Sequence, residues 1–349
     1  MDKLNVAVLF GGCSSEYGVS LESAHAVIKN MDQSRFTPVL IGISPKGSWF
    51  YYSGPVQNIA SDTWENPADC TPAVVSPDRD AHELLVLRED GAAHIHLDAA
   101  FPVLHGKNGE DGTVQGVFAL AGIPLVGCGV LSSALCMDKD RAHKLAHAAG
   151  VSVPSSFLPA REMDTAEALA KAEQIGYPLF VKPVKAGSSY GITKVEKCDE
   201  LPAAIKLAFE YDDQAIVEEA ISGFEVGCAV LGSDALTVGA LDEIELSSGF
   251  FSFTEKYTLK TSLIHVPARI SRARAKEIKQ TARRVYRALG CQGFARVDLF
   301  LDAGGRIIFN EVNTIPGFTA HSRYPSMMKA VGMSLDQVIT AVIELAVEQ

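Results

Sequence analysis

The sequence predicts an α/β domain followed by two α+β lobes, and three observations support this prediction. The first part of the chain alternates strand and helix segments, beginning with the apolar run NVAVLF at residues 5 to 10. A continuous apolar run is typical of a strand buried in a parallel sheet. From Phe224 onward strands dominate. A length of 349 residues favours two or three domains.

Each expected element follows from its local pattern. Further strands at 37–44 and 99–105, with helices from about Val19 and over 113–122, give the βαβ order of a doubly wound sheet. A helix from about Ser132 to Ala149 leads into the second part, where a helix is expected among strands at 177–184, 191–197 and 214–221. The last part combines a helix near 271–289 and a C-terminal helix with strands at 225–232, 235–246, 263–270 and 296–313. We therefore expect domains at 1–130, 131–222 and 223–349.

The composition is that of a globular protein, with 47% hydrophobic and 21% charged residues. The net charge of −11 argues against a nucleic-acid partner, which would need a dense basic surface. It does not argue against a bound nucleotide, because a phosphate site is local.

Cysteine usage and hydropathy predict a cytoplasmic protein with no membrane segment. The seven cysteines are scattered without a CxxC pair, which indicates reduced thiols and no zinc site. The N-terminal apolar run is too short for a signal peptide. Residues 117 to 137 carry no charge and match membrane length, but Gly122, Pro124, Gly127 and Gly129 interrupt them. We interpret this stretch as a buried crossover.

The segment RVDLFLDAGGRIIFNEVN, residues 296 to 313, has the pattern of a hairpin that carries carboxylates. A two-residue turn at Gly304 and Gly305 would place Glu311 opposite Asp298. Two like charges about 5 Å apart across a strand pair repel each other, so a cation is expected between them. Mg²⁺, with its preference for carboxylate and phosphate oxygens, fits best. The alternative is a solvated hairpin face in a slightly different register.

The segment FVKPVKAGSSYGITKV, residues 180 to 195, has the pattern of a phosphate-binding loop. Lys182 ends a strand, and small residues follow that let backbone N–H groups approach phosphate oxygens. The segment matches neither the Walker pattern nor GxGxxG. A simple hairpin turn is the alternative.

Three further loops carry candidate groups. Glu16 follows the first strand at the sheet edge where α/β proteins bind ligands. It could hold an ammonium group, it could favour the start of a helix capped by Ser15 or Ser20, and both could be true. His105 and Lys139 lie in loops where structural or exposed roles are equally ordinary. The aromatic segment SSGFFSFTEKYTLK, residues 247 to 260, predicts either a lid or a loop packed on its own lobe.

Eight segments in this order resemble the D-alanine:D-alanine ligase family of ATP-grasp enzymes over nearly the whole chain. They are LFGGCSSEYGVSLES, LHGKNGEDGTVQG, MDKDRAHK, VKPVKAGSSYGI, VEEAISGFEV, TEKY, GFARVDLF and FNEVNTIPGFTAHS. The resemblance implies an N-terminal doubly wound domain followed by a two-lobed ATP-grasp, and a homodimer. It also implies two Mg²⁺ ions, which Mn²⁺ can replace, on Asp298, Glu311 and Asn313.

The resemblance further implies roles for residues around ATP and the first D-Ala. ATP would be bound by Lys139, Lys182, Ser189, Glu218, Glu225 and Lys256. Glu16 would hold the ammonium of D-Ala, with His105 nearby, and would form a triad with Ser188 and Tyr257. Arg296 and the N–H of Gly317 would stabilise the oxyanion. ATP would phosphorylate D-Ala to an acyl phosphate, which the amine of a second substrate attacks to give a dipeptide for peptidoglycan precursors.

The second substrate is expected to be D-Ser. Tyr257 stands where D-lactate ligases resemble one another in carrying histidine, which disfavours D-lactate. Arg323 follows Ser322 where D-Ala ligases usually have an apolar residue, and Phe251 resembles the lid of serine-type vancomycin-resistance ligases. A donor beside the pocket suits a hydroxyl and penalises a methyl. The alternatives are that Arg323 only pairs with a surface carboxylate, and that the enzyme is an ordinary D-Ala:D-Ala ligase, another ATP-grasp ligase or a nucleotide-binding regulator.

Overall fold

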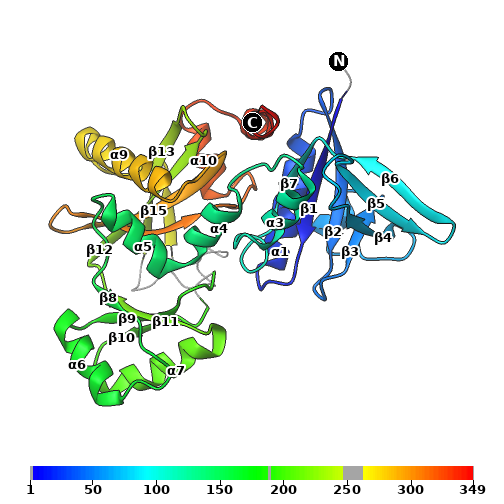
Figure 1. The fold of residues 1–349 in the computed structure, drawn as a ribbon. Coiled ribbons are helices and arrows are strands. Elements are labelled where there is room, and N and C mark those ends of the chain that lie inside the picture. Colours follow the sequence, from blue (N-terminus) through cyan, green and yellow to red (C-terminus); the bar gives the residue numbers. More distant parts are fainter. Residues whose placement is uncertain (1–2, 188–189, 247–261, 349) are drawn as a thin grey trace.

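The computed structural model describes residues 3–187, 190–246 and 262–348, which form three parts built on three sheets (Figure 1). The first part contains a seven-stranded sheet of order β6-β5-β4-β3-β2-β1-β7. Its strands and helices are β1 (Leu4–Gly11), α1 (Tyr17–Asn30), β2 (Phe36–Ile43), β3 (Trp49–Tyr52), α2 (Gln57–Ala60), β4 (Cys70–Val75), β5 (Glu83–Arg88), β6 (Gly91–His96), β7 (Ala99–Pro102) and α3 (Thr113–Ala121).

The parallel core of this sheet is confirmed, and an antiparallel extension adds to it. Strand β1 pairs in parallel with β2 and β7, whereas β3 to β6 continue the sheet in antiparallel order. Alternate residues of β1 enter two different cores, because successive side chains of a strand point to opposite faces. Val6 and Val8 pack with α1, and Ala7 and Leu9 pack with α3. Helices therefore cover both faces, as a doubly wound sheet requires.

The uncharged stretch at 117–137 folds as a buried crossover, as predicted. It contains the end of α3, a single parallel bridge between Leu125 and Ala100, and helix α4 (Val130–Met137). Within the described residues no helix is long and apolar enough to span a membrane.

The expected single helix from Ser132 to Ala149 is wrong, because the chain breaks at Asp138. This residue is extended, and its carboxylate accepts a hydrogen bond from the N–H of Arg141. It thereby caps a new helix, α5 (Lys139–Ala148). The break makes Lys139 the first residue of α5. The backbone N–H of Lys139 bonds to the carbonyl of Val184, which anchors the central lobe to this helix.

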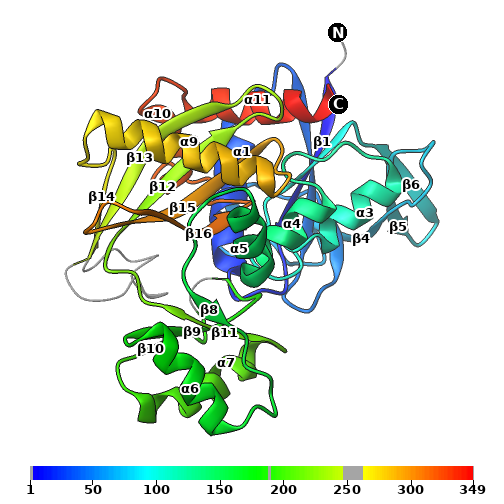
Figure 2. The same cartoon turned by 60° about the vertical axis from the view of Figure 1, so that its left-hand side comes forward.

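The central lobe is a four-stranded antiparallel sheet of order β10-β9-β11-β8, covered by two helices (Figures 1 and 2). Its core is formed by Leu179 and Val181 of the sheet with Ala204 and Ala208 of one helix. The elements are β8 (Ser156–Phe157), α6 (Thr165–Ile175), β9 (Leu179–Pro183), β10 (Thr193–Val195), the 3-10 helix η1 (Cys198–Glu200), α7 (Leu201–Tyr211) and β11 (Ala215–Glu219).

The C-terminal lobe contains a five-stranded antiparallel sheet of order β14-β13-β12-β15-β16. Helix α9 covers one face through Ile278, Ala282 and Val285. The elements are β12 (Gly223–Leu231), β13 (Thr237–Leu246), β14 (Ser262–His265), α9 (Arg272–Ala288), β15 (Phe294–Asp302), β16 (Ile307–Asn313), α10 (Arg323–Lys329) and α11 (Leu335–Val347).

The hairpin β15–β16 reaches the predicted pairing by a different route. The prediction of a two-residue turn is wrong. The N–H of Asp302 bonds to the carbonyl of Arg306, which leaves a three-residue loop, and Gly305, at φ +82°, is its left-handed residue. The register is therefore shifted by one near the turn. A bulge at Asn310 restores it, so that Asp298 faces Glu311 and Arg296 faces Asn313 as predicted.

The C-terminal helix α11 packs against the first part of the chain. Val338, Ile339, Val342 and Ile343 of α11 belong to the same apolar core as β1 and α1, and Figure 2 shows this helix beside β1. Arg35 Nη2 lies 2.5 Å from Glu344 Oε1. The last helix thus packs the C-terminal lobe against the first domain. The predicted order of domains did not include this contact.

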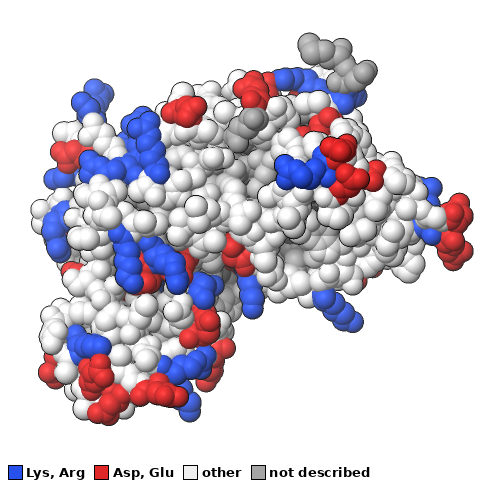
Figure 3. Space-filling model, viewed as in Figure 1, with Lys and Arg blue, Asp and Glu red and all other residues white. Residues whose placement is uncertain are grey.

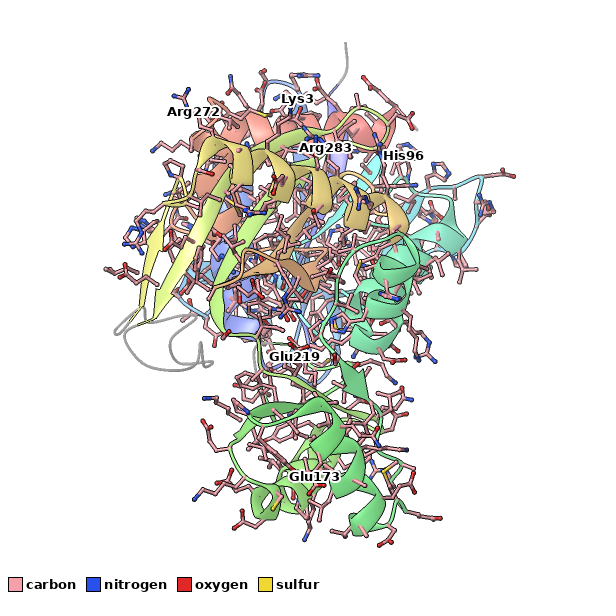
Figure 4. The ribbon with its side chains drawn as sticks, turned by 90° about the vertical axis from the view of Figure 1, so that its left-hand side faces the viewer. Lys3, His96, Glu173, Glu219, Arg272 and Arg283 are labelled. Atoms are coloured by element: carbon pink, nitrogen blue, oxygen red, sulfur yellow. The ribbon has the colours of Figure 1, made fainter. Side chains whose placement is uncertain are left out.

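Charged side chains are mixed over the face in Figure 3, with basic groups gathered where α9 lies. That helix has seven Lys or Arg residues and one acidic residue, Glu277. Arg272 and Arg283, labelled in Figure 4, lie on it. The expectation that the protein has no nucleic-acid partner stays a prediction.

Candidate active site

Three loops from different parts of the chain meet around the carboxylate of Glu16. A Cβ atom built on Gly106 or on Gly187 would lie 2.6 Å from Glu16 Oε2. Glu16 is 9% exposed and precedes α1, but its side chain makes no capping bond to that helix. Ser15 and Ser20 do not cap it either: Ser20 Oγ instead accepts from the N–H of Gly11 and bonds to the carbonyl of Val103. The prediction that Ser15 or Ser20 caps this helix is therefore wrong, whereas Glu16 does stand at the start of the helix.

His105 ties the first domain to the loop after β16. Its Nδ1 lies 2.8 Å from the carbonyl oxygen of Ile315, which can only accept, so Nδ1 carries the proton. Nε2 then accepts from the hydroxyl of Ser23, at 3.2 Å. Burial lowers the pKa of His105, which keeps the ring neutral. In the described structure His105 is thus a positioning residue, and contact with substrate stays a prediction.

Glu110 lies on the same interface and was not predicted. Its two carboxylate oxygens accept from the N–H groups of Gly106 and Ile315, each at 2.9 Å. Burial, together with the neighbouring charge of Glu16, raises the pKa of Glu110 to about 8. Its signal in the sequence was its place in the HGKNGEDG loop, five residues after His105.

The loop after β16 brings Gly317 and Ser322 together. A Cβ on Gly317 would lie 2.9 Å from Ser322 Oγ. This oxygen also accepts from the N–H of Thr319, at 3.1 Å, and bonds to its hydroxyl. Ser322 begins α10, so one turn positions a backbone N–H, a hydroxyl and the following arginine.

The carboxylates of the hairpin are each faced by a fixed cation. Asp298, 1% exposed, accepts from Arg296 Nε and Nη2 at 2.8 Å each. Asn313 Nδ2 donates to it at 2.9 Å. Glu311 Oε2 lies 3.8 Å from Lys139 Nζ. The alternative of a solvated hairpin face is wrong for Asp298, and the expected positive charge between the strands is supplied in part by the protein itself.

Lys182 and Glu218 form an ion pair across neighbouring strands of the central lobe, and both are buried. Glu219, the next residue, lies where the central lobe meets the rest of the molecule (Figure 4). Lys139 Nζ donates to the carbonyl of Ala186 at 3.0 Å. Lys139 at the start of α5 is thus joined to the loop after β9, and Lys182 and Glu218 lie on the central sheet, so three residues predicted to bind ATP come from these two neighbouring parts.

Arg323 lies in a buried group of carboxylates. Its Nε and Nη2 bond to the two oxygens of Asp242 at 2.6 and 2.9 Å, and its Nη1 bonds to Glu225 Oε1 at 2.7 Å. Asp298 Oδ1 is 3.4 Å away. The expectation that Arg323 only pairs with a surface carboxylate is wrong, because Asp242 is 0% exposed. Glu225 contacts this arginine, and its role in ATP binding stays a prediction.

Asp242 is the second residue that sequence reasoning missed. It follows the apolar run ALTVGAL, which begins at residue 235, and a carboxylate in a buried strand is the signal that could have identified it. Five predicted site residues lie outside the described part of the chain. They are Ser188, Ser189, Phe251, Lys256 and Tyr257.

A small cavity of about 40 Å³ joins these parts. It is lined by residues from all three loops, among them Glu16, Glu110, Lys139, Gly187, Glu311 and Asn313. Thr314, which also lines this cavity, has a buried Oγ1 without a hydrogen-bond partner among the described residues, and Glu218 Oε2 and His143 Nδ1 are two further atoms of this kind. Such atoms are rare in native proteins and indicate places where a ligand or water binds.

The residues present fit ATP and Mg²⁺ in chemical type. Lys139 and Lys182 supply positive charge for phosphates. Two carboxylates and one amide suit an ion that is held mainly by phosphate oxygens. No group of three or more His, Cys, Asp or Glu side chains that could hold a metal by itself occurs within residues 3–187, 190–246 and 262–348.

Two lobes that face each other over lysines and paired carboxylates define an ATP-grasp ligase. Family models described as the N-terminus and the C-terminus of D-ala D-ala ligase match residues 5–128 and 145–344. The chain belongs to the D-alanine–D-alanine ligase family and is an ATP-dependent ligase.

Individual relatives cover the whole chain. The vancomycin B-type resistance protein of Enterococcus faecalis is 47% identical over 100% of both chains. A putative D-alanine–D-lactate ligase of Streptomyces coelicolor is 44% identical over 99% of this chain and 98% of its own. The crystal structure of VanG D-Ala:D-Ser ligase from Enterococcus faecalis is 55% identical, with a TM-score of 0.90, over 99% of this chain and 100% of that chain.

Proposed function

We propose that this enzyme joins D-Ala to D-Ser through an acyl phosphate, for use in peptidoglycan precursors. The observation that carries the proposal is the fixed guanidinium of Arg323. Relatives named for different second substrates have comparable identities, so overall similarity does not decide the second substrate. The likeness to a D-Ala:D-Ser ligase at 55% identity supports the same choice.

Arg323 is held so that it can still donate. An arginine has five N–H donors, and three of them bond to Asp242 and Glu225. The contact with Asp298 is longer, at 3.4 Å. Within the part of the chain that the structure describes, Nη1 bonds to one acceptor, so its second hydrogen can serve a further acceptor such as the hydroxyl of D-Ser. A methyl group there would leave this buried donor without a partner, which penalises D-Ala.

The other residues divide the work of the reaction. Glu16, held between Gly106 and Gly187, binds the ammonium of the first D-Ala. Lys139 and Lys182 bind phosphates of ATP and offset their charge while the D-Ala carboxylate attacks the γ-phosphorus, ADP leaves, and an acyl phosphate forms. The second amine then attacks the acyl phosphate. Arg296 and the N–H of Gly317 stabilise the developing oxyanion, and the amine loses a proton as phosphate leaves.

Asp298, Glu311 and Asn313 would hold Mg²⁺, which neutralises phosphate charge when it is bound. Arg296 fixes the Asp298 carboxylate through two bonds, and Lys139 lies beside Glu311. Chelation by EDTA should abolish turnover, and added Mg²⁺ or Mn²⁺ should restore it. Full turnover in EDTA would contradict this part of the proposal.

Product analysis tests the choice of second substrate. The purified enzyme is supplied with ATP, Mg²⁺ and D-Ala, with and without equimolar D-Ser, and the dipeptides are separated by mass. D-Ala-D-Ser should dominate in the mixture. Mainly D-Ala-D-Ala would overturn the proposal in favour of an ordinary D-Ala:D-Ala ligase.

The variant Arg323→Leu tests the role of the arginine. The ratio of kcat/KM for D-Ser to that for D-Ala should fall about tenfold, the effect of one buried donor. Both kcat/KM values are measured on the same preparation, so a loss of folded protein lowers both equally and leaves their ratio unchanged. Arg306→Leu is the matched control, since Arg306 pairs with Asp302 at the exposed end of the hairpin. An unchanged ratio in the first variant would remove Arg323 from the proposal.

We further propose that the enzyme is a homodimer, on the family resemblance alone. Sedimentation equilibrium of the purified chain tests this directly, and a monomer at micromolar concentration would contradict it.

A further inference from the structure

We propose that helix α9 carries a docking surface for an anionic phospholipid membrane. The surface is a stripe of five cations on this helix, which consists of Arg272, Lys276, Lys279, Arg283 and Arg287. The inference goes beyond the proposed reaction and does not depend on its second substrate. Such a peripheral contact needs no membrane-spanning helix, because the charge of anionic headgroups attracts a basic face.

The stripe follows the helical repeat along nearly the whole of α9. Its members are spaced by three or four residues, and residues at these spacings stand on one face of a helix. From Arg272 to Arg287 the helix rises about 22 Å, at about 1.5 Å per residue. The buried face of α9, with Ile278, Ala282 and Val285, packs in the core of the lobe, and the stripe lies outside it.

No acidic group neutralises the stripe within the described residues. Glu277, the one acidic residue of α9, pairs with Arg274, which is not a member of the stripe. Arg272, Lys276 and Arg287 are exposed, and none of the five cations forms an ion pair within residues 3–187, 190–246 and 262–348. Like charges at neighbouring positions of a helix repel each other. This repulsion lowers stability unless an anionic partner lies against the stripe.

The length of the stripe favours an extended anionic surface over one small ion. Figure 4 shows two of its members, Arg272 and Arg283, on the same helix, and basic groups gather there in Figure 3. Near the end of α9, Arg283 and Arg287 line an open hollow of about 550 Å³ together with Arg284. A hollow of this size can receive a phosphate headgroup, while the rest of the stripe contacts neighbouring lipids.

A lipid surface suits the stripe better than a nucleic acid does. Sites for single-stranded nucleic acid combine positive charge with aromatic side chains on which bases stack. The one aromatic residue of α9, Tyr286, is buried. The net charge of −11 does not prevent docking, because charges farther away than about 8 Å are largely screened at physiological ionic strength.

Docking through α9 would leave the reacting groups uncovered. Successive residues of a strand point to opposite faces of the sheet. Val297 and Leu299 of β15 belong to the same core as α9, so Arg296 and Asp298 point to the other face. The stripe and these site residues thus lie on opposite faces of the sheet, and the stripe can be altered without touching the site.

The test measures how the purified full-length enzyme partitions onto vesicles in a co-sedimentation assay. Vesicles of phosphatidylcholine mixed with phosphatidylglycerol should bind the enzyme, and vesicles of phosphatidylcholine alone should not. The triple variant Arg272→Gln, Lys276→Gln, Arg283→Gln should lower the partition coefficient about a hundredfold, or about fivefold for each lost cation. Its melting temperature and its turnover in solution should match wild type.

A matched control removes three lysines from the central lobe, in the triple variant Lys171→Gln, Lys194→Gln, Lys206→Gln. The net charge changes by the same amount, and vesicle binding should stay at the wild-type level. An equal loss in both triple variants would overturn the proposal, because net charge alone would then explain binding. Absence of binding to the anionic vesicles at low salt would overturn it as well.

Two further outcomes would assign the stripe to another partner and overturn the proposal. One is tighter binding to an oligonucleotide than to the anionic vesicles. The other is a wild-type dimer that becomes a monomer in the stripe variant, because a second copy of the chain would then occupy the surface. None of the binding measurements uses turnover, so a failure of the D-Ser proposal leaves them intact.

Discussion

Removing the Arg323 side chain should destabilise the C-terminal lobe strongly, because it leaves Asp242 buried and unpaired. Asp242 is 0% exposed and has three donors: Arg323 Nε, Arg323 Nη2 and the N–H of Gly227, at 2.7 Å. Burial by itself would raise the pKa of Asp242, but the charge and hydrogen bonds of Arg323 hold it below its ordinary value. The carboxylate is therefore ionised because the arginine is present.

The magnitude follows from the hydrogen bonds that the substitution removes from Asp242. Arg323→Leu removes two charge-assisted bonds and keeps one backbone donor. Breaking one partner of a buried ion pair costs about 3–5 kcal/mol in free energy of unfolding. Replacing both partners with apolar residues is often close to neutral. The double variant Asp242→Leu with Arg323→Leu should thus be more stable than Arg323→Leu alone.

Urea unfolding followed by far-ultraviolet circular dichroism measures this effect. The expected order of midpoints places wild type highest, the double variant next and Arg323→Leu lowest. This ranking does not require two-state unfolding. A double variant whose midpoint lies at or below that of Arg323→Leu would refute the reasoning, because Asp242 would then not be costly without its partner.

Three further predictions concern the cleft. Glu110 has a pKa of about 8, well above the ordinary value of 4.5; stability should therefore decline as pH rises from about 4.5 to 8, and Glu110→Gln should flatten this part of the pH profile of the melting temperature. Gly187→Ala would place a methyl 2.6 Å from Glu16 Oε2, so KM for the first D-Ala should rise about tenfold or more in steady-state kinetics. Lys182→Met removes the partner of Glu218 and a phosphate-binding charge, so KM for ATP should rise by at least about tenfold.

Each of these predictions has its own control. A pH profile unchanged by Glu110→Gln would assign the decline to other groups. Gly116→Ala adds a methyl where no atom lies within 4 Å and should leave D-Ala kinetics unaltered; an equal loss in both glycine variants would count against the Glu16 contact. Lys194→Met removes an exposed lysine paired with Glu196, and a matching rise in KM for ATP there would contradict the specific role of Lys182.

Local patterns in the sequence determined the layered fold and much of the site. The apolar run at residues 5–10 predicted a buried parallel strand, and a turn placed at Gly304 and Gly305 predicted the pairing of Asp298 with Glu311. Ordered motifs identified the family and the ATP-grasp fold. These features were predictable because strand periodicity and short motifs depend only on neighbouring residues.

Tertiary structure decided what depends on contacts between distant residues. The turn and the bulge at Asn310 cancel each other in register, which no local pattern reveals. Helix α5 is fixed at its start by the bond from the N–H of Lys139 to the carbonyl of Val184, which comes from another part of the chain. Arg323 looked like a surface or pocket residue, yet it neutralises a carboxylate 81 positions away in the chain. Burial and long-range charge pairing arise only when the chain has folded, so the sequence determined which groups the site contains and the fold decided which partner each group has.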